Sequence, residues 1–409
     1  MKAREFARWT HERIPRLRAF LGRLRVQGER AFVEARKWLE EDRRRLWGAL
    51  AIALAAGVGL AATQSQAIGR YARVIFAPRT VVPLTDEARR AAASRAQQLA
   101  AALDSRLDRK ARFGGEAWTS ARMLVALREG DPAYARRVEA RRMEAYFRSV
   151  SGPECACWRK LPDGRHPNHL GITAWTLWAF SAYGVPAHKS EIEFVLSTQN
   201  RQGWWPLFAG ATDARFASTY GTAAAILALH EQSGLAQKGR QRERIAGAVQ
   251  RGASWLRGQA SAGRGRWTDY PAWPKTKERR ELVGVSGFAL YALHRVGAQR
   301  LPDLDREWLA NLPAEIPEAR RGETSGKLVK IGSRTYRDDS PYHALPWAIL
   351  GTLSAYPNGS ISERARAVQW LERALEPGGA IHALKGTEGP IAAEALFALR
   401  SYPEITGNK

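Results

Sequence analysis

Six short apolar segments recur along this chain and constrain its fold more than any single residue does. Each is about nine residues long and apolar nearly all round, which is typical of a helix buried on every side. Their starts lie roughly 46 to 64 residues apart, a spacing suited to a repeat of two helices. The segments are 119–127, 172–180, 221–229, 285–293, 345–353 and 391–399.

Charged segments with amphipathic helical spacing alternate with the apolar ones. They are 85–107, 134–150, 190–198, 242–258, 304–312 and 362–375. Six buried helices inside six amphipathic ones predict an all-α domain, an α6/α6 toroid over residues 85–402. An open α-solenoid is the alternative, but the apolar segments lack the polar face that an open concave surface needs. Residues 327–337, KLVKIGSRTYR, also predict a short hairpin around Gly332-Ser333.

The N-terminal part of the chain predicts a membrane anchor. Residues 46–62 contain no polar side chain, and a span takes roughly 17 to 25 such residues. Arg43, Arg44 and Arg45 precede them, and basic clusters stay on the cytoplasmic side. A buried soluble helix is the alternative. The sequence therefore predicts a single-pass protein with its N-terminus in the cytoplasm and the toroid outside it.

The resulting domain organisation has five parts. We expect a basic amphipathic cytoplasmic segment (1–45), a transmembrane helix (46–69), a linker (70–84), the toroid (85–402) and a tail (403–409). The formal net charge of +24 favours an anionic partner, such as the inner leaflet for the first segment. Nucleic acid is an improbable partner for a domain outside the cytoplasm.

Loops that lead into the apolar helices repeat the residues Gln, Gly and Trp. One copy has Phe194-Val195-Leu196, Gln199, Gly203 and Trp204, and a second has Trp255-Leu256, Gln259, Gly265 and Trp267. Trp370-Leu371 with Gly378-Gly379 is a degenerate third copy, and Tyr220-Gly221-Thr222 opens an apolar helix. These residues resemble the QW repeats of terpenoid cyclases and the related β-subunits of protein prenyltransferases. The resemblance implies the toroid fold, with Gln bonding a helix end and Trp packing over a turn.

The chain departs from these families at their catalytic residues. It has no DxDD motif, whose central Asp protonates an alkene in the cyclases that carry it. It also has no Cys on its last three apolar segments to complete the zinc site of a prenyltransferase. The resemblance therefore supports the architecture and neither parent activity.

A toroid brings the N-termini of all its inner helices to one rim, where free N–H groups favour an anion. We expect functional residues there. The candidate catalytic residues are Asp338, Asp339 and Asp213, and the candidate ligand-binding residues are His166, His169, Arg215, Tyr220, Tyr342, His343, Trp175 and Trp347. The aromatic members either line a pocket or fill the core.

Zinc is the one metal that the sequence suggests. Cys155, Cys157, His166 and His169 have the spacing C-x-C-x8-H-x2-H, and zinc accepts such ligands. This spacing matches no common zinc site, so we expect no cofactor unless these four side chains converge. The two cysteines form either a small strained ring or a pair of thiols.

Three functions remain open from the sequence. The first is binding of a hydrophobic or polyprenyl-type ligand at the mouth of the inner helices, which an empty apolar cavity would favour. The second is glycan hydrolysis or lysis by rim carboxylates, which an open groove would favour. The third is a non-catalytic scaffold in a membrane protein complex, which a centre plugged by side chains would favour.

Overall fold

The computed structural model divides the chain into two compact units, residues 1–78 and 79–409. It describes only residues of the second unit: 86–107, 112–113, 117–130, 134, 140–152, 157–158, 168–235, 239–260, 266–272, 282–297, 328–331, 334–337, 347, 369, 371–377, 379, 381–382 and 390–401. The predicted segments 1–45, 46–69, 70–84 and 403–409 lie outside these ranges. Among the described residues, no helix is both long and apolar enough to cross a bilayer.

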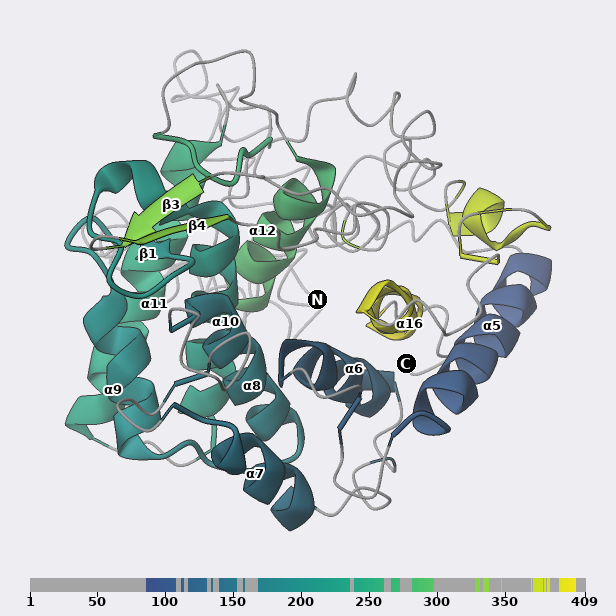
Figure 1. Ribbon diagram of the computed structural model, residues 1–409. Helices are drawn as coiled ribbons and strands as arrows, with labels where there is room; N and C mark the ends of the chain where they lie inside the picture. Colours follow the sequence, from purple (N-terminus) through teal and green to yellow (C-terminus); the bar gives the residue numbers. More distant parts are fainter. Residues whose placement is uncertain are drawn as a thin grey trace, which may run out of the picture. The chain divides into compact units, whose positions relative to one another are not determined.

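The described residues are mostly helical, which confirms the coarse fold class (Figure 1). The helices are α5 (Asp86–Asp104), α6 (Ala117–Gly130), α7 (Ala140–Ser149), α8 (Leu170–Ala182), α9 (Lys189–Thr198), the 3-10 helix η2 (Ala214–Phe216), α10 (Thr219–Ser233), α11 (Arg240–Gln259), α12 (Val283–Arg295) and α16 (Pro390–Ser401). Strands β1 (Trp205–Pro206) and β2 (Ala217–Ser218) form one antiparallel pair. Strands β3 (Leu328–Ile331) and β4 (Arg334–Arg337) form the expected hairpin, with Ile331 opposite Arg334.

Buried and amphipathic helices alternate as the sequence pattern predicts. Helix α8 buries every residue from Leu170 to Phe180, and α10 buries every residue from Thr219 to Leu229. Helix α11 instead buries one side, including Ile245, Val249, Gly252 and Leu256, while most of its arginines stay exposed. The apolar segment 345–353 lies outside the described residues except for Trp347.

The buried helices pack side by side in one succession. Helix α6 contacts both α16 and α8, and α10 contacts both α8 and α12 (Figure 1). The amphipathic helices cover this succession, because α5 packs on α16 and α6, α9 on α8, and α11 on α10 and α12. Segments far apart in the sequence, α6 and α16, are thus neighbours. The apolar sides of the buried helices are thus covered by one another and by the amphipathic helices.

A repeated pair of hydrogen bonds ties three amphipathic helices, α7, α9 and α11, to the buried helix that follows each of them. The indole N–H of Trp205 donates to the carbonyl of Val195 in α9 at 2.7 Å, and its backbone N–H donates to the hydroxyl of Thr222 in α10 at 3.0 Å. The same pair of bonds joins Trp158 to Phe147 and Thr173, and Trp267 to Leu256 and Ser286. All three tryptophans are fully buried. We call this arrangement the tryptophan tie.

Among the residues that the structure describes, helix α6 has only the backbone bond of the tryptophan tie. The backbone N–H of Phe113 donates to the hydroxyl of Ser120 in α6 at 2.9 Å. The hydroxyl residue occupies the second position of the aligned apolar segments in all four cases, at Ser120, Thr173, Thr222 and Ser286. The last two segments have Pro346 and Ala392 there, which have no hydroxyl to offer.

The tie corrects the reading of the Gln–Gly–Trp repeat. Trp205, and not Trp204, makes the two structural bonds, whereas the indole of Trp204 donates to the side chain of Gln202. Gln199 does more than bond the end of its own helix. Its amide nitrogen donates to the carbonyls of Gly203, at 3.0 Å, and Ala248 in the middle of α11, at 2.9 Å. Gln199 therefore links two neighbouring amphipathic helices.

Replacement of Gly203 by Ala is expected to destabilise the fold by at least about 2 kcal/mol. Gly203 has a φ of +102°, and a Cβ there would lie 2.5 Å from the carbonyl oxygen of Arg251. The matched control is Gly258→Ala at an exposed position of α11, where nothing lies within 4 Å of an added Cβ. Urea unfolding of the full chain in detergent, followed by circular dichroism, measures both variants. Equal stabilities for the two would contradict the described backbone contact.

Candidate functional site

The N-terminus of α10 is closed by the carboxylate of Asp269. Its Oδ1 accepts from the hydroxyl of Ser218 at 2.8 Å and from the backbone N–H of Tyr220 at 3.0 Å. The backbone N–H of Thr219 donates to the carbonyl of Asp269 at 2.7 Å. Asp269 is buried, and the sequence analysis missed it because it lies about 50 residues from the helix that it caps. At the N-terminus of α10, the helix N–H groups are thus satisfied by the protein itself.

Asp213 and Arg215 form an exposed ion pair at η2. The Nη2 of Arg215 lies 2.6 Å from Oδ2 of Asp213, and the backbone N–H of Arg215 donates to Oδ1. The side-chain hydrogen bond from Arg215 holds the pKa of Asp213 below its ordinary value. A carboxylate held in its ionised form is a poor proton donor at neutral pH. The predicted catalytic residue Asp213 is therefore placed as a cap of η2.

His169 caps α8 and is almost fully buried. Its Nδ1 accepts from the backbone N–H of Ile172 at 3.2 Å, and its ring meets the edge of Phe208 with centroids 4.7 Å apart. Its neighbour at the predicted zinc site, Cys157, is buried and disulfide-bonded, so it offers no thiolate. Within the described ranges, no three His, Cys, Asp or Glu side chains come together as metal ligands. Cys155 and His166 lie outside those ranges.

Tyr220 lies in the first turn of α10 and contacts side chains of α8 and α12. It is 1% exposed, and its hydroxyl accepts from the indole N–H of Trp175 at 2.7 Å. Its ring lies 4.9 Å from that of Phe288, centroid to centroid. Burial raises the pKa of the Tyr220 phenol above its ordinary value, so the group stays a neutral hydrogen-bonding partner. Two predicted ligand-binding residues, Tyr220 and Trp175, thus bind each other.

A buried ion pair joins α6 and α16, the first and last buried helices among the described residues. The guanidinium of Arg122 in α6 contacts the carboxylate of Glu394 in α16, and their side chains are 1% and 2% exposed. The Cζ of Arg122 also lies 4.9 Å from the ring centroid of Trp118 and 5.6 Å from that of Trp175. The sequence contained a signal for this pair, since each residue is the one charged member of an apolar segment. Their partnership across 272 residues was not visible in it.

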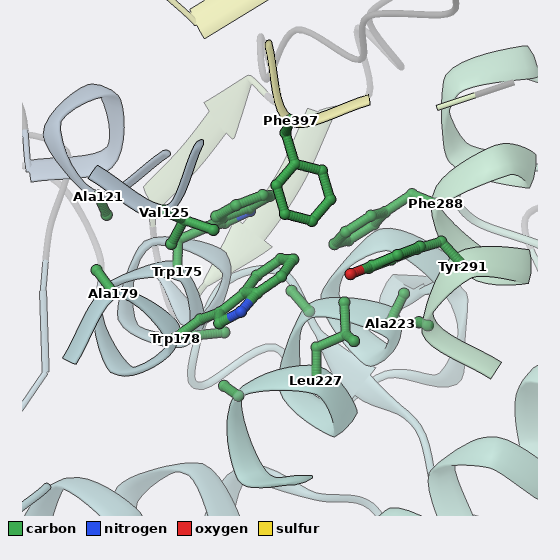
Figure 2. Packing of buried hydrophobic residues seen from close by; sticks show 14 of the residues in the cluster. Ala121, Val125, Trp175, Trp178, Ala179, Ala223, Leu227, Phe288, Tyr291 and Phe397 are labelled. Carbon is green, nitrogen blue, oxygen red and sulfur yellow. The ribbon is translucent and has the colours of Figure 1, made fainter. Parts of the chain in front are cut away.

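Aromatic rings from three buried helices meet in one cluster (Figure 2). We call them the central aromatic cluster: Trp175 and Trp178 of α8, Phe288 and Tyr291 of α12, Phe397 of α16, and Trp347. Arg122 of the ion pair borders this cluster at Trp175. The centroids of Trp175 and Phe288 are 5.8 Å apart, and those of Trp178 and Phe397 are 5.6 Å apart. Trp347 joins α12 to α16, since it lies 4.6 Å from Phe288 and 5.8 Å from Phe397. These separations are those of rings in direct contact.

The predicted site is thus brought together only in part. Tyr220, Trp175 and Trp347 belong to one connected group, whereas Asp213 and Arg215 form a separate exposed pair. Asp338, Asp339, Tyr342 and His343 lie outside the described residues. Arg122, Glu394 and Asp269 are the polar groups that the prediction lacked.

Comparison with known proteins adds no activity to this geometry. The sequence matches no protein-family model and no curated protein. What the site can do must therefore be inferred from its own contacts. In the described residues these are helix caps, hydrogen bonds, ion pairs and ring contacts within the chain.

Replacement of Glu394 by Leu is expected to cost about 3 to 5 kcal/mol, because it leaves the guanidinium of Arg122 buried without its carboxylate. The double variant Arg122→Met/Glu394→Leu is expected to recover most of that loss. The control is Glu193→Leu, which breaks the exposed pair with Arg244 and costs at most about 1 kcal/mol. Urea unfolding of the three variants provides the comparison. A loss in the Glu394 variant no larger than in the control would show that the pair is not buried.

Proposed function

We propose that residues 85–402 form a closed α6/α6 toroid that acts as a scaffold for a protein partner in a membrane complex. The observation that carries this proposal is the central aromatic cluster, whose side chains would fill the middle of such a ring. A filled centre leaves the outer surface and the rims as the places where the ring meets other molecules.

Ring closure is supported by the succession of buried helices and by Trp347. Helices α12, α10, α8, α6 and α16 follow one another as neighbours, and α16 comes from the end of the chain. Trp347 belongs to the remaining apolar segment and contacts rings of both α12 and α16. A sixth inner helix in that segment would fill the position between them.

The anchor is part of this proposal. Its support is the apolar segment 46–62 together with Arg43, Arg44 and Arg45, which favour a cytoplasmic N-terminus. An alkaline phosphatase fused after Lys409 tests the orientation, because this enzyme is active only outside the cytoplasm. An inactive fusion that is folded and membrane-bound would contradict it.

The candidate carboxylate that the structure describes, Asp213, gives less support to glycan hydrolysis or lysis. A glycosidase needs a carboxylic acid with a raised pKa to protonate the leaving oxygen. Arg215 shifts the pKa of Asp213 in the opposite direction. The candidates Asp338 and Asp339 stay predictions.

A hydrophobic or polyprenyl-type ligand is the second candidate, and a specific observation favours it. The indole N–H groups of Trp178 and Trp347 are buried, and neither has a hydrogen-bond partner among the described residues. A buried donor without an acceptor is costly, so a ligand that carries an oxygen atom would be favoured beside them. Such a ligand would have to separate rings that are in contact.

Native mass spectrometry of the full chain, extracted from its own membrane in a mild detergent, distinguishes the two candidates. The scaffold proposal predicts a protein partner at fixed stoichiometry and no apolar ligand retained by the chain. The ligand proposal predicts a retained lipid whose amount falls in a Trp178→Phe variant, which keeps an aromatic ring but removes the N–H donor. A retained lipid with that dependence would overturn the scaffold proposal.

A further inference from the structure

A groove on the outer surface lies between α9 and α11, away from the central aromatic cluster. Its volume is about 370 Å³, and it is lined by Leu196, Arg240, Glu243, Arg244, Gly247 and Arg251. Three guanidinium groups thus share one hollow with a single carboxylate, that of Glu243. The groove carries a net positive charge on a surface that the fold leaves open.

The spacing of these residues along α11 explains why they converge. Positions 240, 244, 247 and 251 are separated by four, three and four residues, which places them on one face of a helix. Gly247 sits between the arginines and has no side chain to fill the hollow. A Cβ added there would lie 3.5 Å from Nη1 of Arg251, so the guanidinium borders the space that the glycine leaves.

The three arginines differ in how their charge is balanced. Arg244 makes two parallel bonds to the carboxylate of Glu193, at 2.6 and 2.8 Å, which fixes it at the groove wall. Arg251 donates to the neutral amide oxygen of Gln199 at 2.6 Å. Arg240 is exposed, and within the described residues neither it nor Arg251 has a carboxylate within salt-bridge distance. Two guanidinium charges are therefore available to a ligand.

We propose that this groove binds a phosphate group, held by Arg240 and Arg251. A planar guanidinium matches two phosphate oxygens at once, and such charge-assisted bonds are the strong ones in partly exposed sites. The phosphate could belong to an anionic lipid headgroup or to a soluble phosphate compound, which present the same oxygens. The proposal is independent of the scaffold function, because the groove lies on the amphipathic helices and not in the ring centre.

Two binding measurements on the full chain test this site and separate the two sources. In the first, pyrophosphate is titrated into the protein in a neutral detergent, and binding is followed by calorimetry at low and high salt. In the second, hydrogen exchange of residues 240–251 is compared in nanodiscs of phosphatidylcholine with and without phosphatidylglycerol. The variants are Arg240→Gln and Arg251→Gln, and the matched control is Arg242→Gln, an exposed arginine of α11 outside the groove.

Each groove variant is expected to weaken binding about tenfold, while Arg242→Gln leaves it unchanged. Affinity should also fall with added salt. Pyrophosphate binding with this pattern supports the site with a soluble ligand. Slower exchange that appears only with phosphatidylglycerol, and is lost in the groove variants, supports it with a lipid. Absence of both effects, or an equal loss in Arg242→Gln, would overturn the proposal.

Discussion

Direct contact among the central aromatic rings is the interaction on which the rest of the described structure depends. The buried helices are apolar on every side, so the amphipathic helices can cover only their outer faces. The inner faces need partners from helices that lie opposite. Trp175, Trp178 and Phe397 provide them together with Phe288 and Tyr291, and Trp347 closes the group. Large rings on these helices therefore fill the space that their small residues leave between them.

The tryptophan ties hold this arrangement together one repeat at a time. Each tie satisfies an indole and a backbone N–H that burial would otherwise leave unbonded. The indole donates to a carbonyl of the amphipathic helix, and the backbone N–H donates to a hydroxyl of the buried helix, which gives a role to the Ser or Thr at the second position of those apolar segments. Candidate rim residues have a comparable role. His169, Asp213 and the unexpected Asp269 use their polar atoms to cap helices.

The helices and their alternation could be predicted from the sequence, because the two kinds of segment have different residue patterns. One kind is apolar at nearly every position, and the other is apolar on one helical face only. The hairpin of β3 and β4 was predictable from its turn residues. The choice between Trp204 and Trp205 was not, since adjacent tryptophans differ only in which hydrogen bonds the backbone lets them reach. Arg122 and Glu394 were each visible as a charge in an apolar segment. Their pairing depends on the packing of α6 against α16, which no local pattern encodes.

The central aromatic cluster is filled by the chain's own side chains, and the proposed scaffold function depends on this packing. An electron cryomicroscopy or crystal map of the full protein, purified without added ligand, measures this directly. We expect the rings of Trp175, Phe288, Trp347 and Phe397 to be in van der Waals contact with no density between them. A continuous non-protein density that separates the ring of Trp178 from those of Tyr291 and Phe397 would contradict it.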